Sequence, residues 1–480
     1  MGILLFPRIW VLIATIFLGY FLLRMLVTLV FAVVGDRRIA TWSRRDWTVD
    51  EQLPGDTGIS PADVYHAVIV PNYKEPEEVL RRTLDGLAAQ HRAKERLIVV
   101  LAMEERESGS RAKGERLASS YEDRFASLVV SVHPGGMPDE VPGKSSNMFW
   151  ATRALKQTVT DMGADVSNTT VTSCDADSVF HPSYFAAVSH LFAHDKRRYA
   201  RFWQAPLLYV NNIWRVPAPV RFTTWFIHSG QIAELAMPFY VPLPISTYTL
   251  SLRLAEECGW WDPLVISEDW HTFLQCEVVR EGDVGLTPVY LPTRADVAEG
   301  NGFWSGIRAR HEQVMRHAWG AEDVGYLLGE LRQGNCCRSV RMLARTSQVL
   351  HDHSLRVASW FLILSAYVLN IGNHPIYAAA NGRSVDAIPQ TAAIIGVLFL
   401  TGGIMIGATL MLELKRDPPP PGVSVFKFAV ELACMWFLLP ITGLYLGMLP
   451  ALRAQTKMML RRPFYYEVTL KSSTSVSDVA

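Results

Sequence analysis

The stretch Thr169-Thr170-Val171-Thr172-Ser173-Cys174-Asp175-Ala176-Asp177 decides how this chain is interpreted. Its first six residues are small or β-branched and predict a strand, which two carboxylates follow directly. Open α/β sheets bind their ligands at the carboxyl ends of the strands, so Asp175 and Asp177 are candidate ligand-binding residues. Both can face one divalent ion only if the chain turns on leaving the strand, which Ala176 permits. Taken alone, D-x-D is a weak signal because solvated turns contain it too.

The sequence around this strand has the alternating pattern of an α/β domain. Strands are predicted at residues 66–70 and 97–102, and residues 77–90 between them carry apolar side chains at helical spacing. Strands that alternate with helices favour a mostly parallel sheet covered by helices. We therefore expect one α/β domain over residues 63–330.

The composition predicts that part of the chain lies in lipid, and the balanced charge predicts no strongly charged partner. The 480 residues are 49% hydrophobic, which is typical of a protein with membrane segments. Lysine plus arginine and aspartate plus glutamate each number 46, so we expect no nucleic-acid partner. The six cysteines include no C-x-x-C pair, which disfavours a zinc site or a disulfide framework.

Residues 9–34 predict an N-terminal membrane anchor. They are apolar apart from Arg24 and long enough to cross about 30 Å of hydrocarbon. A cleaved signal peptide is the alternative, but its apolar region would be shorter. One arginine, Arg8, precedes the segment, whereas four follow it: Arg37, Arg38, Arg44 and Arg45. The positive-inside rule then predicts an anchor over residues 1–36, a linker over 37–62 and a cytosolic α/β domain, in a multi-pass protein of the plasma (inner) membrane.

Three further apolar stretches, residues 355–372, 388–412 and 426–449, follow the α/β domain. Basic residues flank the first two on one side, which predicts a hairpin of two spans. A complete crossing by the third would leave the basic tail, residues 453–480, outside the cell. A re-entrant hairpin hinged near Pro440, or an interfacial helix, would keep it inside, so three or four crossings remain open. These expectations place an interfacial connection at residues 331–354 and transmembrane helices at 355–452.

Two further segments carry candidate functional groups. Gly143-Lys144-Ser145-Ser146-Asn147 opens a predicted helix, whose free N–H groups and lysine suit an anion such as a diphosphate. An ordinary helix N-cap is the alternative. Glu268-Asp269 follows an aromatic stretch, and Asp269 is placed to accept a proton from a hydroxyl group. The alternative is an acid that interacts with a helix dipole.

Five motifs occur in a fixed order along the chain. They are Val70-Pro71-Asn72-Tyr73-Lys74-Glu75, Asp175-Ala176-Asp177, Gln204-Ala205-Pro206, Ser267-Glu268-Asp269 and Gln313-Val314-Met315-Arg316. In this order they resemble glycosyltransferase family 2, particularly its membrane-embedded branch with cellulose, hyaluronan and chitin synthases. The motifs look like the first-strand nucleotide motif, the metal-binding D-x-D, Q-x-P, T-E-D and the start of Q-x-x-R-W of that family.

The resemblance implies a GT-A fold, an α/β domain with a mostly parallel sheet, combined with transmembrane helices. It implies a nucleotide-sugar donor, a UDP-sugar, and Mg²⁺ or Mn²⁺ held by Asp175 and Asp177. Asp269 matches the catalytic base, with Glu268 beside it. The residues assigned to donor binding are Pro71, Tyr73, Glu75, Glu104 and Asp175 from the resemblance and Lys144 from its place at the start of a helix, and those matched to acceptor binding are Gln204, Pro206, Gln313, Arg316 and Trp319.

Two departures from the family pattern are visible. The second strand ends in Glu104-Glu105 where many relatives have an aspartate pair. Trp319 follows Arg316 by three positions instead of one, so the two side chains leave a helix about 300° apart. For Trp319, a position in the hydrophobic core is the alternative to the acceptor site.

We weigh three functions for this set of motifs and apolar segments. The first is extension of a polysaccharide that passes through the transmembrane helices, and the second is transfer of one sugar to a lipid acceptor. Few membrane crossings are predicted, so they favour a channel for the polysaccharide only if an oligomer or re-entrant helices complete that channel. The third, a transporter or scaffold without catalysis, would predict loss of the acidic residues, yet Asp175, Asp177 and Asp269 are present. The sugar and its linkage depend on pocket contacts that motifs do not fix.

Overall fold

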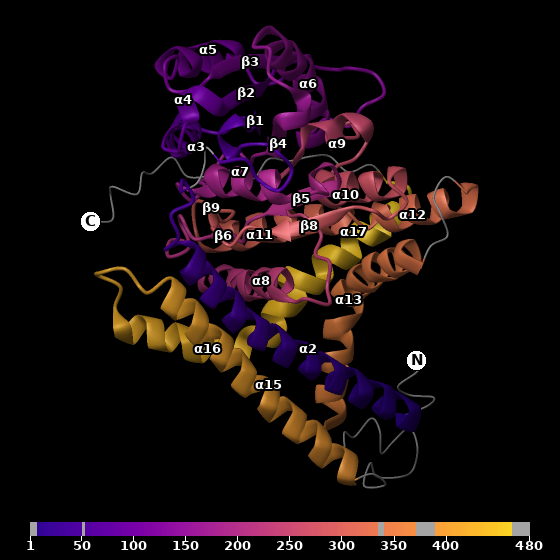
Figure 1. Ribbon diagram of the computed structural model, residues 1–480. Coiled ribbons are helices and arrows are strands. Elements are labelled where there is room, and N and C mark those ends of the chain that lie inside the picture. The colour runs from indigo at the N-terminus through magenta and orange to yellow at the C-terminus, as the bar shows by residue number, and fades with distance from the viewer. Residues whose placement is uncertain (1–6, 50–52, 335–339, 371–388, 463–480) are drawn as a thin grey trace.

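The computed structural model describes residues 7–49, 53–334, 340–370 and 389–462, and its centre is a seven-stranded sheet (Figure 1). The strand order is β3-β2-β1-β4-β7-β5-β8. The strands are β1 (Tyr65–Pro71), β2 (Leu97–Glu104), β3 (Ser127–His133), β4 (Thr169–Ser173), β5 (Arg201–Gln204), β7 (Tyr248–Ser251) and β8 (Gly285–Pro288). All neighbours pair in parallel except β7, which is antiparallel to both β4 and β5. The expected mostly parallel α/β sheet is confirmed.

Helices cover both faces of the sheet because its central strands are apolar on both sides. All eight residues of β2 are buried, and successive side chains of a strand point to opposite faces. Ile98 and Val100 accordingly belong to one hydrophobic core, and Leu97 and Val99 to the other. The covering helices include α3 (Glu77–Ala88), α5 (Ser110–Ser120), α6 (Lys144–Asp161), α7 (Tyr184–His194), α9 (Leu252–Glu257), α10 (Glu268–Val279) and α12 (Glu322–Gln333), with the short α4 (Ala93–Arg96) before β2.

The first half of the domain follows the expected elements closely. β1 is one residue longer at each end than the predicted 66–70, β2 runs two residues beyond 102, and α3 ends two residues before 90. Boundaries are the part of a sequence pattern that carries the weakest signal. The predicted strand before Asp175 is β4, and the helix predicted after Gly143 is α6.

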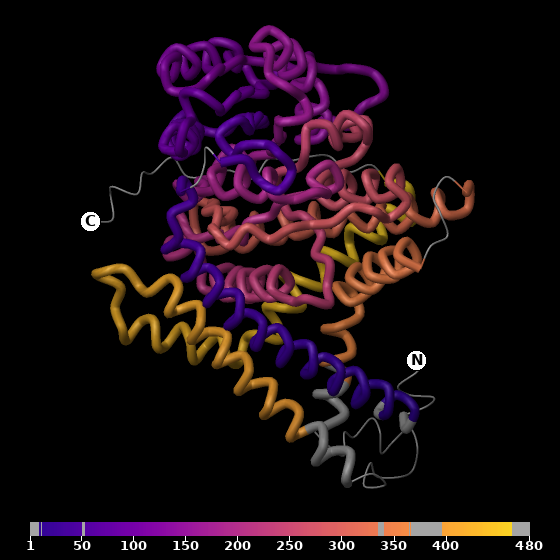
Figure 2. Tube along the Cα trace, viewed as in Figure 1, coloured from indigo at the N-terminus to yellow at the C-terminus, as the bar shows by residue number. Residues whose placement is uncertain are grey.

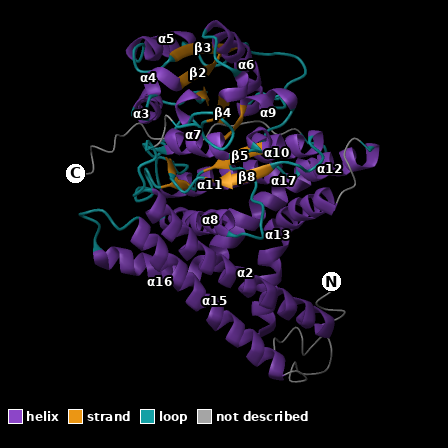
Figure 3. Ribbon diagram, viewed as in Figure 1, coloured by secondary structure: helices purple, strands orange, loops and turns teal. Residues whose placement is uncertain are grey.

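A smaller set of elements lies level with β5 and β8 and leads toward the long helices (Figure 1). It contains β6 (Leu207–Tyr209) and β9 (Thr293–Ala295), which pair in parallel, and the helices α8 (Ala218–Ala236) and α11 (Phe303–Trp319). Figure 3 shows strands confined to the upper part of the molecule and helices alone in the lower part. The lower helices are α2 (Pro7–Trp42), α13 (Val340–Asn370), α15 (Pro389–Arg416), α16 (Val425–Gly443), the π-helical turn η5 (Leu444–Met448) and α17 (Leu449–Met459).

Within the described residues, three helical segments have the length and apolar composition to cross a membrane: Leu12–Trp42, Gly396–Arg416 and Val425–Met459. The first and second agree with the expected stretches at 9–34 and 388–412. The stretch expected at 355–372 falls on the second half of α13, and its last two residues lie outside the described residues.

The ends of α2 and α15 meet beneath the α/β domain, and Figure 2 shows the two helices side by side. The Arg416 guanidinium donates two hydrogen bonds to Asp36, at 2.8 and 2.9 Å. Glu413 accepts a hydrogen bond of 2.7 Å from the hydroxyl of Ser229 in α8. Buried polar groups of this kind are stable only when paired, so they fix these helix ends against the domain.

A re-entrant hairpin hinged near Pro440, one of the alternatives for the last apolar stretch, is wrong. Pro440 lies inside α16, and the helix continues to Gly443. Proline has no N–H to donate to the helix. The chain nevertheless continues into a π-helical turn instead of breaking. Within that turn, the Tyr445 carbonyl accepts a hydrogen bond of 2.9 Å from His311 in α11. Glu431, in the first half of α16, forms an ion pair with Arg221 of α8, so this segment contacts the α/β domain on both sides of Pro440.

Candidate active site

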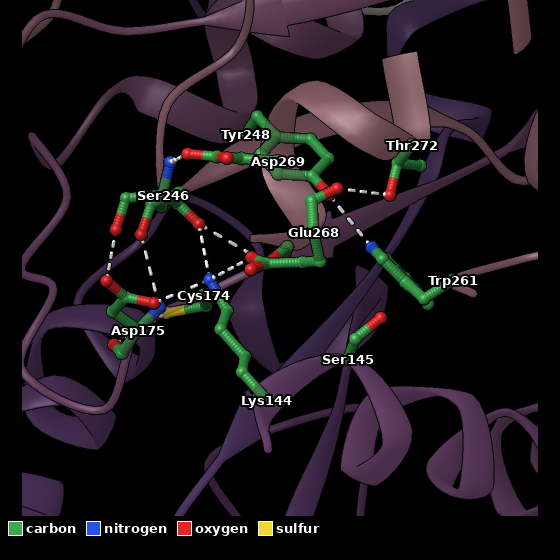
Figure 4. Close-up of polar contacts among 12 residues, drawn as sticks. Lys144, Ser145, Cys174, Asp175, Ser246, Tyr248, Trp261, Glu268, Asp269 and Thr272 are labelled. Carbon is green, nitrogen blue, oxygen red and sulfur yellow. Dashed lines mark hydrogen bonds and ion pairs between the residues drawn. The ribbon is translucent and has the colours of Figure 1, made fainter. Parts of the chain in front are cut away.

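Four segments bring charged side chains together at the edge of the sheet where its parallel strands end (Figure 4). Asp175 follows β4, and Lys144 begins α6. Glu268 and Asp269 form the first turn of α10. The fourth segment, Ile245-Ser246-Thr247, precedes β7 and reaches the same edge because β7 runs antiparallel to its neighbours. We call this segment the β7 loop.

Lys144 lies at the centre of the cluster. Its ammonium nitrogen is 2.6 Å from Asp175 Oδ1 and 2.7 Å from Glu268 Oε1, and it donates a hydrogen bond of 2.6 Å to the Ser246 carbonyl. Burial opposes the charge of Lys144, but the carboxylates of Asp175 and Glu268 raise its pKa well above the ordinary value. Lys144 is therefore a charged group that joins α6, β4, α10 and the β7 loop.

Ser246 joins the two acids that the sequence assigned to different roles. Its backbone N–H donates a hydrogen bond of 3.0 Å to Asp269 Oδ2, and its hydroxyl donates one to Asp175. The hydroxyl of Thr247 accepts a bond of 3.1 Å from the Asp175 N–H. No motif in the sequence marked these two residues, and a serine-threonine pair before a short strand is too common a signal to find them.

Burial shifts both acids of α10 toward the protonated form. It raises the pKa of Glu268 to about 7; Lys144 opposes this shift and the charge of Asp269 adds to it. Burial also raises the pKa of Asp269, while the N–H groups of Ser246 and Trp270 oppose the shift. These N–H groups occupy one oxygen each, at 3.0 and 2.9 Å. The carboxylate is held in a fixed orientation and has a proton affinity above that of an ordinary aspartate.

Asp177 points to a different part of the site from Lys144. Its side chain is 2% exposed, and Oδ2 accepts a hydrogen bond of 2.9 Å from the Asp296 N–H after β9. Asp296 is itself held by Arg82 through two contacts of 2.7 Å. Over the described ranges, no group of three or more His, Cys, Asp or Glu side chains has the arrangement to hold a metal ion.

Tyr209 of β6 nevertheless lies near all three acids. Burial raises the pKa of its hydroxyl, and the nearby charges of Asp175, Asp177 and Asp269 raise it further, while Arg310 opposes them. Charges act on a pKa in this way only over short distances. The two aspartates of D-x-D and the candidate base therefore all lie within electrostatic range of one tyrosine.

The residues matched to the nucleotide lie at the ends of β1 and β2. Pro71 closes β1, and the Tyr73 ring lies 4.5 Å from the Arg106 guanidinium. Glu104 closes β2 and is 3% exposed; burial raises its pKa, and the ion pair with Arg106 opposes the shift. Glu75 is 9% exposed.

Glu107 shapes this part of the site and was not predicted from the sequence. Its carboxylate accepts hydrogen bonds from the Asn72 side chain at 3.2 Å and from the Lys74 N–H at 2.6 Å, and it pairs with Lys113. Lys74 has φ 61°, a left-handed conformation that non-glycine residues rarely adopt. The position of Glu107, three residues after β2, gave no signal in the sequence, because its partners Asn72 and Lys74 follow the end of β1.

The residues matched to the acceptor occupy two layers. Gln204 is 3% exposed: its carbonyl oxygen accepts from the Ile245 N–H at 2.9 Å, and its amide donates to the carbonyls of Thr247 at 3.1 Å and Ala205 at 2.7 Å. Its side chain therefore contacts the β7 loop directly. The carbonyl of Pro206, the other matched residue of the motif, accepts a bond of 2.9 Å from the Thr293 N–H.

The matched residues of α11 lie toward the long helices. Gln313 accepts a hydrogen bond of 2.6 Å from Arg310, and the Arg316 carbonyl accepts one of 3.2 Å from Ser267, two residues before Asp269. Trp319 is 8% exposed and belongs to a hydrophobic cluster with Ala451 of α17. The structure thus brings Arg316 close to the S-E-D segment and places Trp319 in a packed core.

His271 fixes the helix that carries both acids. It lies 2.7 Å from Asp323 at the start of α12 and 3.4 Å from Asp262. Burial opposes its charge, but these two carboxylates raise the pKa of His271 to about 9. The charged imidazole therefore ties α10 to α12.

Comparison with known proteins places this site in a family. No curated protein matches the chain. Among solved structures, the mannosyltransferase PcManGT from Pyrobaculum calidifontis, in complex with GDP-Man and Mn²⁺, is 15% identical over 93% of this chain and 100% of that chain, with a TM-score of 0.40. S. aureus TarS 1–349 in complex with UDP-GlcNAc is 14% identical over 75% and 93%, with a TM-score of 0.35. GalNAc-T7 with UDP, GalNAc and Mn²⁺ is 10% identical over 60% and 58%, with a TM-score of 0.37.

The family described as glycosyltransferase like family 2 matches residues 61–308, just over half of the chain. The match runs from four residues before β1 into α11 and includes Lys144, Asp175 and Asp269. The mostly parallel sheet with this match is a GT-A fold. The chain belongs to glycosyltransferase like family 2.

Proposed function

We propose that this protein is an inverting, metal-dependent hexosyltransferase of the membrane-embedded branch, which takes a sugar from a UDP-sugar and extends a polysaccharide. The observation that carries the proposal is the placement of Asp269. Two N–H groups orient this carboxylate, and Ser246 and Lys144 join it to Asp175 at the end of β4. A base therefore lies beside a cationic group suited to a diphosphate.

The reaction needs a base on the acceptor and positive charge on the leaving group. Asp269 accepts the proton of the acceptor hydroxyl as its oxygen attacks the anomeric carbon and the bond to the nucleoside diphosphate breaks. A single displacement of this kind inverts the configuration at that carbon. Lys144 faces the diphosphate with its ammonium group, and Glu268 holds Lys144 in place.

The donor set fits Mg²⁺ or Mn²⁺. Magnesium binds through one or two carboxylates and completes its ligands with substrate phosphates and water, which matches two aspartates without a ready-made cage. Asp175, Glu268 and Asp269 also exceed the charge of Lys144, and this excess of negative charge favours a cation. Asp175 and Asp177 would hold the ion, which supplies positive charge to the departing diphosphate.

The remaining matched residues form the donor and acceptor sites. The nucleotide binds against Pro71, Tyr73, Glu75 and Glu104, at the ends of β1 and β2. The acceptor binds on the side of α11 where Gln313 and Arg316 lie, with Gln204 and Pro206 beneath the β7 loop, whereas Trp319 belongs to the packed core beside α17.

The proposal includes an α/β domain in the cytosol at the plasma (inner) membrane, with α2, the apolar second half of α13 and α15 crossing the membrane. The C-terminal segment Val425–Met459 lies in the interface instead of crossing. It contacts the α/β domain on both sides of Pro440, through Glu431 and through the core around Trp319. Phe426 and Phe437 on this segment are each 80% exposed, which suits a helix with one face in lipid.

Labelling with an impermeant thiol reagent tests this topology. Single cysteines near residues 51, 381 and 475, positions outside the described residues, would be placed in a chain without native cysteines. In intact cells we expect labelling at 381 alone. Labelling near 51 would overturn the cytosolic placement, and labelling near 475 would show a complete crossing with an exported tail.

A second function, transfer of one sugar to a lipid acceptor, is favoured by Arg356 in α13. Its guanidinium lies 5.5 Å from the ring centre of Trp270, the residue after the base, and donates a bond of 3.3 Å to the His317 carbonyl. Beyond Arg356, α13 continues into an apolar stretch. An acceptor that arrives along α13 from the bilayer would reach Asp269.

Membranes incubated with a panel of radiolabelled UDP-sugars separate these functions. A labelled polymer on a sizing column supports chain extension, and a single-sugar lipid in the organic phase supports the second function. Membranes with Asp269→Asn protein are the control for other transferases. Absence of transfer from every UDP-sugar of the panel, with folded protein present, contradicts both.

A further inference from the structure

We propose that Ser246 is a positioning residue that couples the donor-side carboxylate Asp175 to the base Asp269. The inference rests on the proposed function, because it gives that site an internal connection between its two halves. No motif assigns a role to Ser246. Its three polar groups each contact a different charged residue of the site, which no other residue of the β7 loop does.

The contacts of Ser246 divide between the two sides of the site. Its hydroxyl donates to Asp175 and its carbonyl accepts from Lys144 at 2.6 Å, both on the donor side. Its N–H donates to Asp269 at 3.0 Å, on the acceptor side. A movement of Asp175 or Lys144 toward a diphosphate is therefore transmitted to the N–H that orients the base.

The backbone of Ser246 is held in a conformation that serine does not favour. Its φ is 57°, in the left-handed region where glycine is the least costly residue. Gln204 holds the loop on both sides of Ser246, through the Ile245 N–H and the Thr247 carbonyl. Residues kept in such conformations cluster at functional sites, where the surrounding structure over-determines them.

The presence of serine at this position indicates that its side chain is used. Glycine would fit the backbone and keep both backbone hydrogen bonds, but it would lose the hydroxyl on Asp175. Glycine would also allow the loop more conformations, so the N–H of residue 246 that donates to Asp269 would be less firmly held. Serine supplies both the hydroxyl and a confined loop.

Two substitutions separate these contributions. Ser246→Ala removes the hydroxyl and keeps the confining Cβ, so we expect the KM for donor to rise about tenfold, with kcat little changed. Ser246→Gly removes both, so we expect the same rise in KM and a further fall in kcat of about tenfold. In Ser246→Gly alone, the acid limb of the kcat profile should move to higher pH, because the bond that favours the ionised base is looser.

Glu281→Gly is the matched control for relief of backbone strain. Glu281 also has positive φ, 53°, and is exposed after the end of α10. Both glycine substitutions relieve the strain of a positive φ, but only Ser246→Gly should change the kinetics. A purely structural role for Ser246 predicts instead that the two variants behave alike, and that result would overturn the inference.

A binding measurement distinguishes failure of this inference from failure of the proposed function. Calorimetry of UDP with Mg²⁺ on wild-type and Ser246→Ala protein needs no turnover. Equal affinities would overturn the coupling even if the wild type transfers sugar. Weaker binding by Ser246→Ala would support the coupling even if no acceptor is found and the proposed transfer fails.

Discussion

The two halves of the sheet supply the site in opposite ways. In the half β3-β2-β1-β4, every strand is parallel, and the functional side chains follow the carboxyl ends of strands, as Asp175 follows β4. In the half β7-β5-β8, β7 runs antiparallel to its neighbours. The residues that precede β7, including Ser246, therefore lie at the same edge of the sheet. Strand direction therefore decides which end of a strand carries function.

This difference explains why the first half could be predicted from the sequence. Buried parallel strands are continuous apolar runs, and the helices between them have their own period, so the pattern is local. Strands β1, β2 and β4 fall within two residues of their predicted positions. Lys144 was placed correctly at the start of a helix for the same reason.

The second half depends on contacts between distant residues, which local pattern does not record. β7 has four residues, and its direction is set by pairing with β4, for example Thr172 with Thr249. The hydrogen bonds of Gln204 to the β7 loop and of Asp177 to the Asp296 N–H join segments at least 40 residues apart. The helical course through Pro440 likewise depends on packing against the domain on both sides of this residue.

The largest effect is expected at Asp269, the charge that the antiparallel half holds in place. Asp269→Asn keeps the shape of the side chain, but its amide can accept only one of the two N–H bonds and cannot take up a proton, so kcat should fall by about 10²–10⁴-fold. Donor affinity, measured by calorimetry with UDP and Mg²⁺, should stay within a few fold. Turnover near the wild-type rate would remove Asp269 from the role of base.

A second effect tests whether the parallel half carries the metal. Asp177→Ala should weaken Mg²⁺-dependent UDP binding about tenfold or more, because the ion loses a carboxylate ligand and the diphosphate charge is less compensated. Titration with and without a chelator measures it. Asp296→Asn is the control, since Asp177 contacts the backbone of Asp296 and not its carboxylate. An affinity in Asp177→Ala that is unchanged and equally sensitive to chelator would contradict the metal assignment.

Lys144 joins the two halves, so its removal should cost stability as well as binding. Lys144→Met leaves Asp175 and Glu268 without their cation, and loss of one partner of a buried ion pair costs about 3 kcal/mol. Urea unfolding of detergent-solubilised protein measures the change. Adding Glu268→Gln to Lys144→Met should restore part of the loss, because one unpaired carboxylate disappears. Equal stabilities of the single and double variants would show that Glu268 and Lys144 do not depend on each other.

The smallest effect concerns the support behind the antiparallel half, the contact of His271 with Asp323. The folded-state pKa of His271, about 9, is above its ordinary value of 6.5, so its protonation stabilises the folded protein. This contribution is fully present below about pH 6.5 and is lost as pH rises through 9, and burial of both partners limits it to about 1–3 kcal/mol. Unfolding free energies of the wild type should fall between these pH values, whereas those of His271→Gln should change less over the same range. If the two curves are parallel, His271 is neutral in the folded protein, and α10 is held to α12 by packing instead of charge.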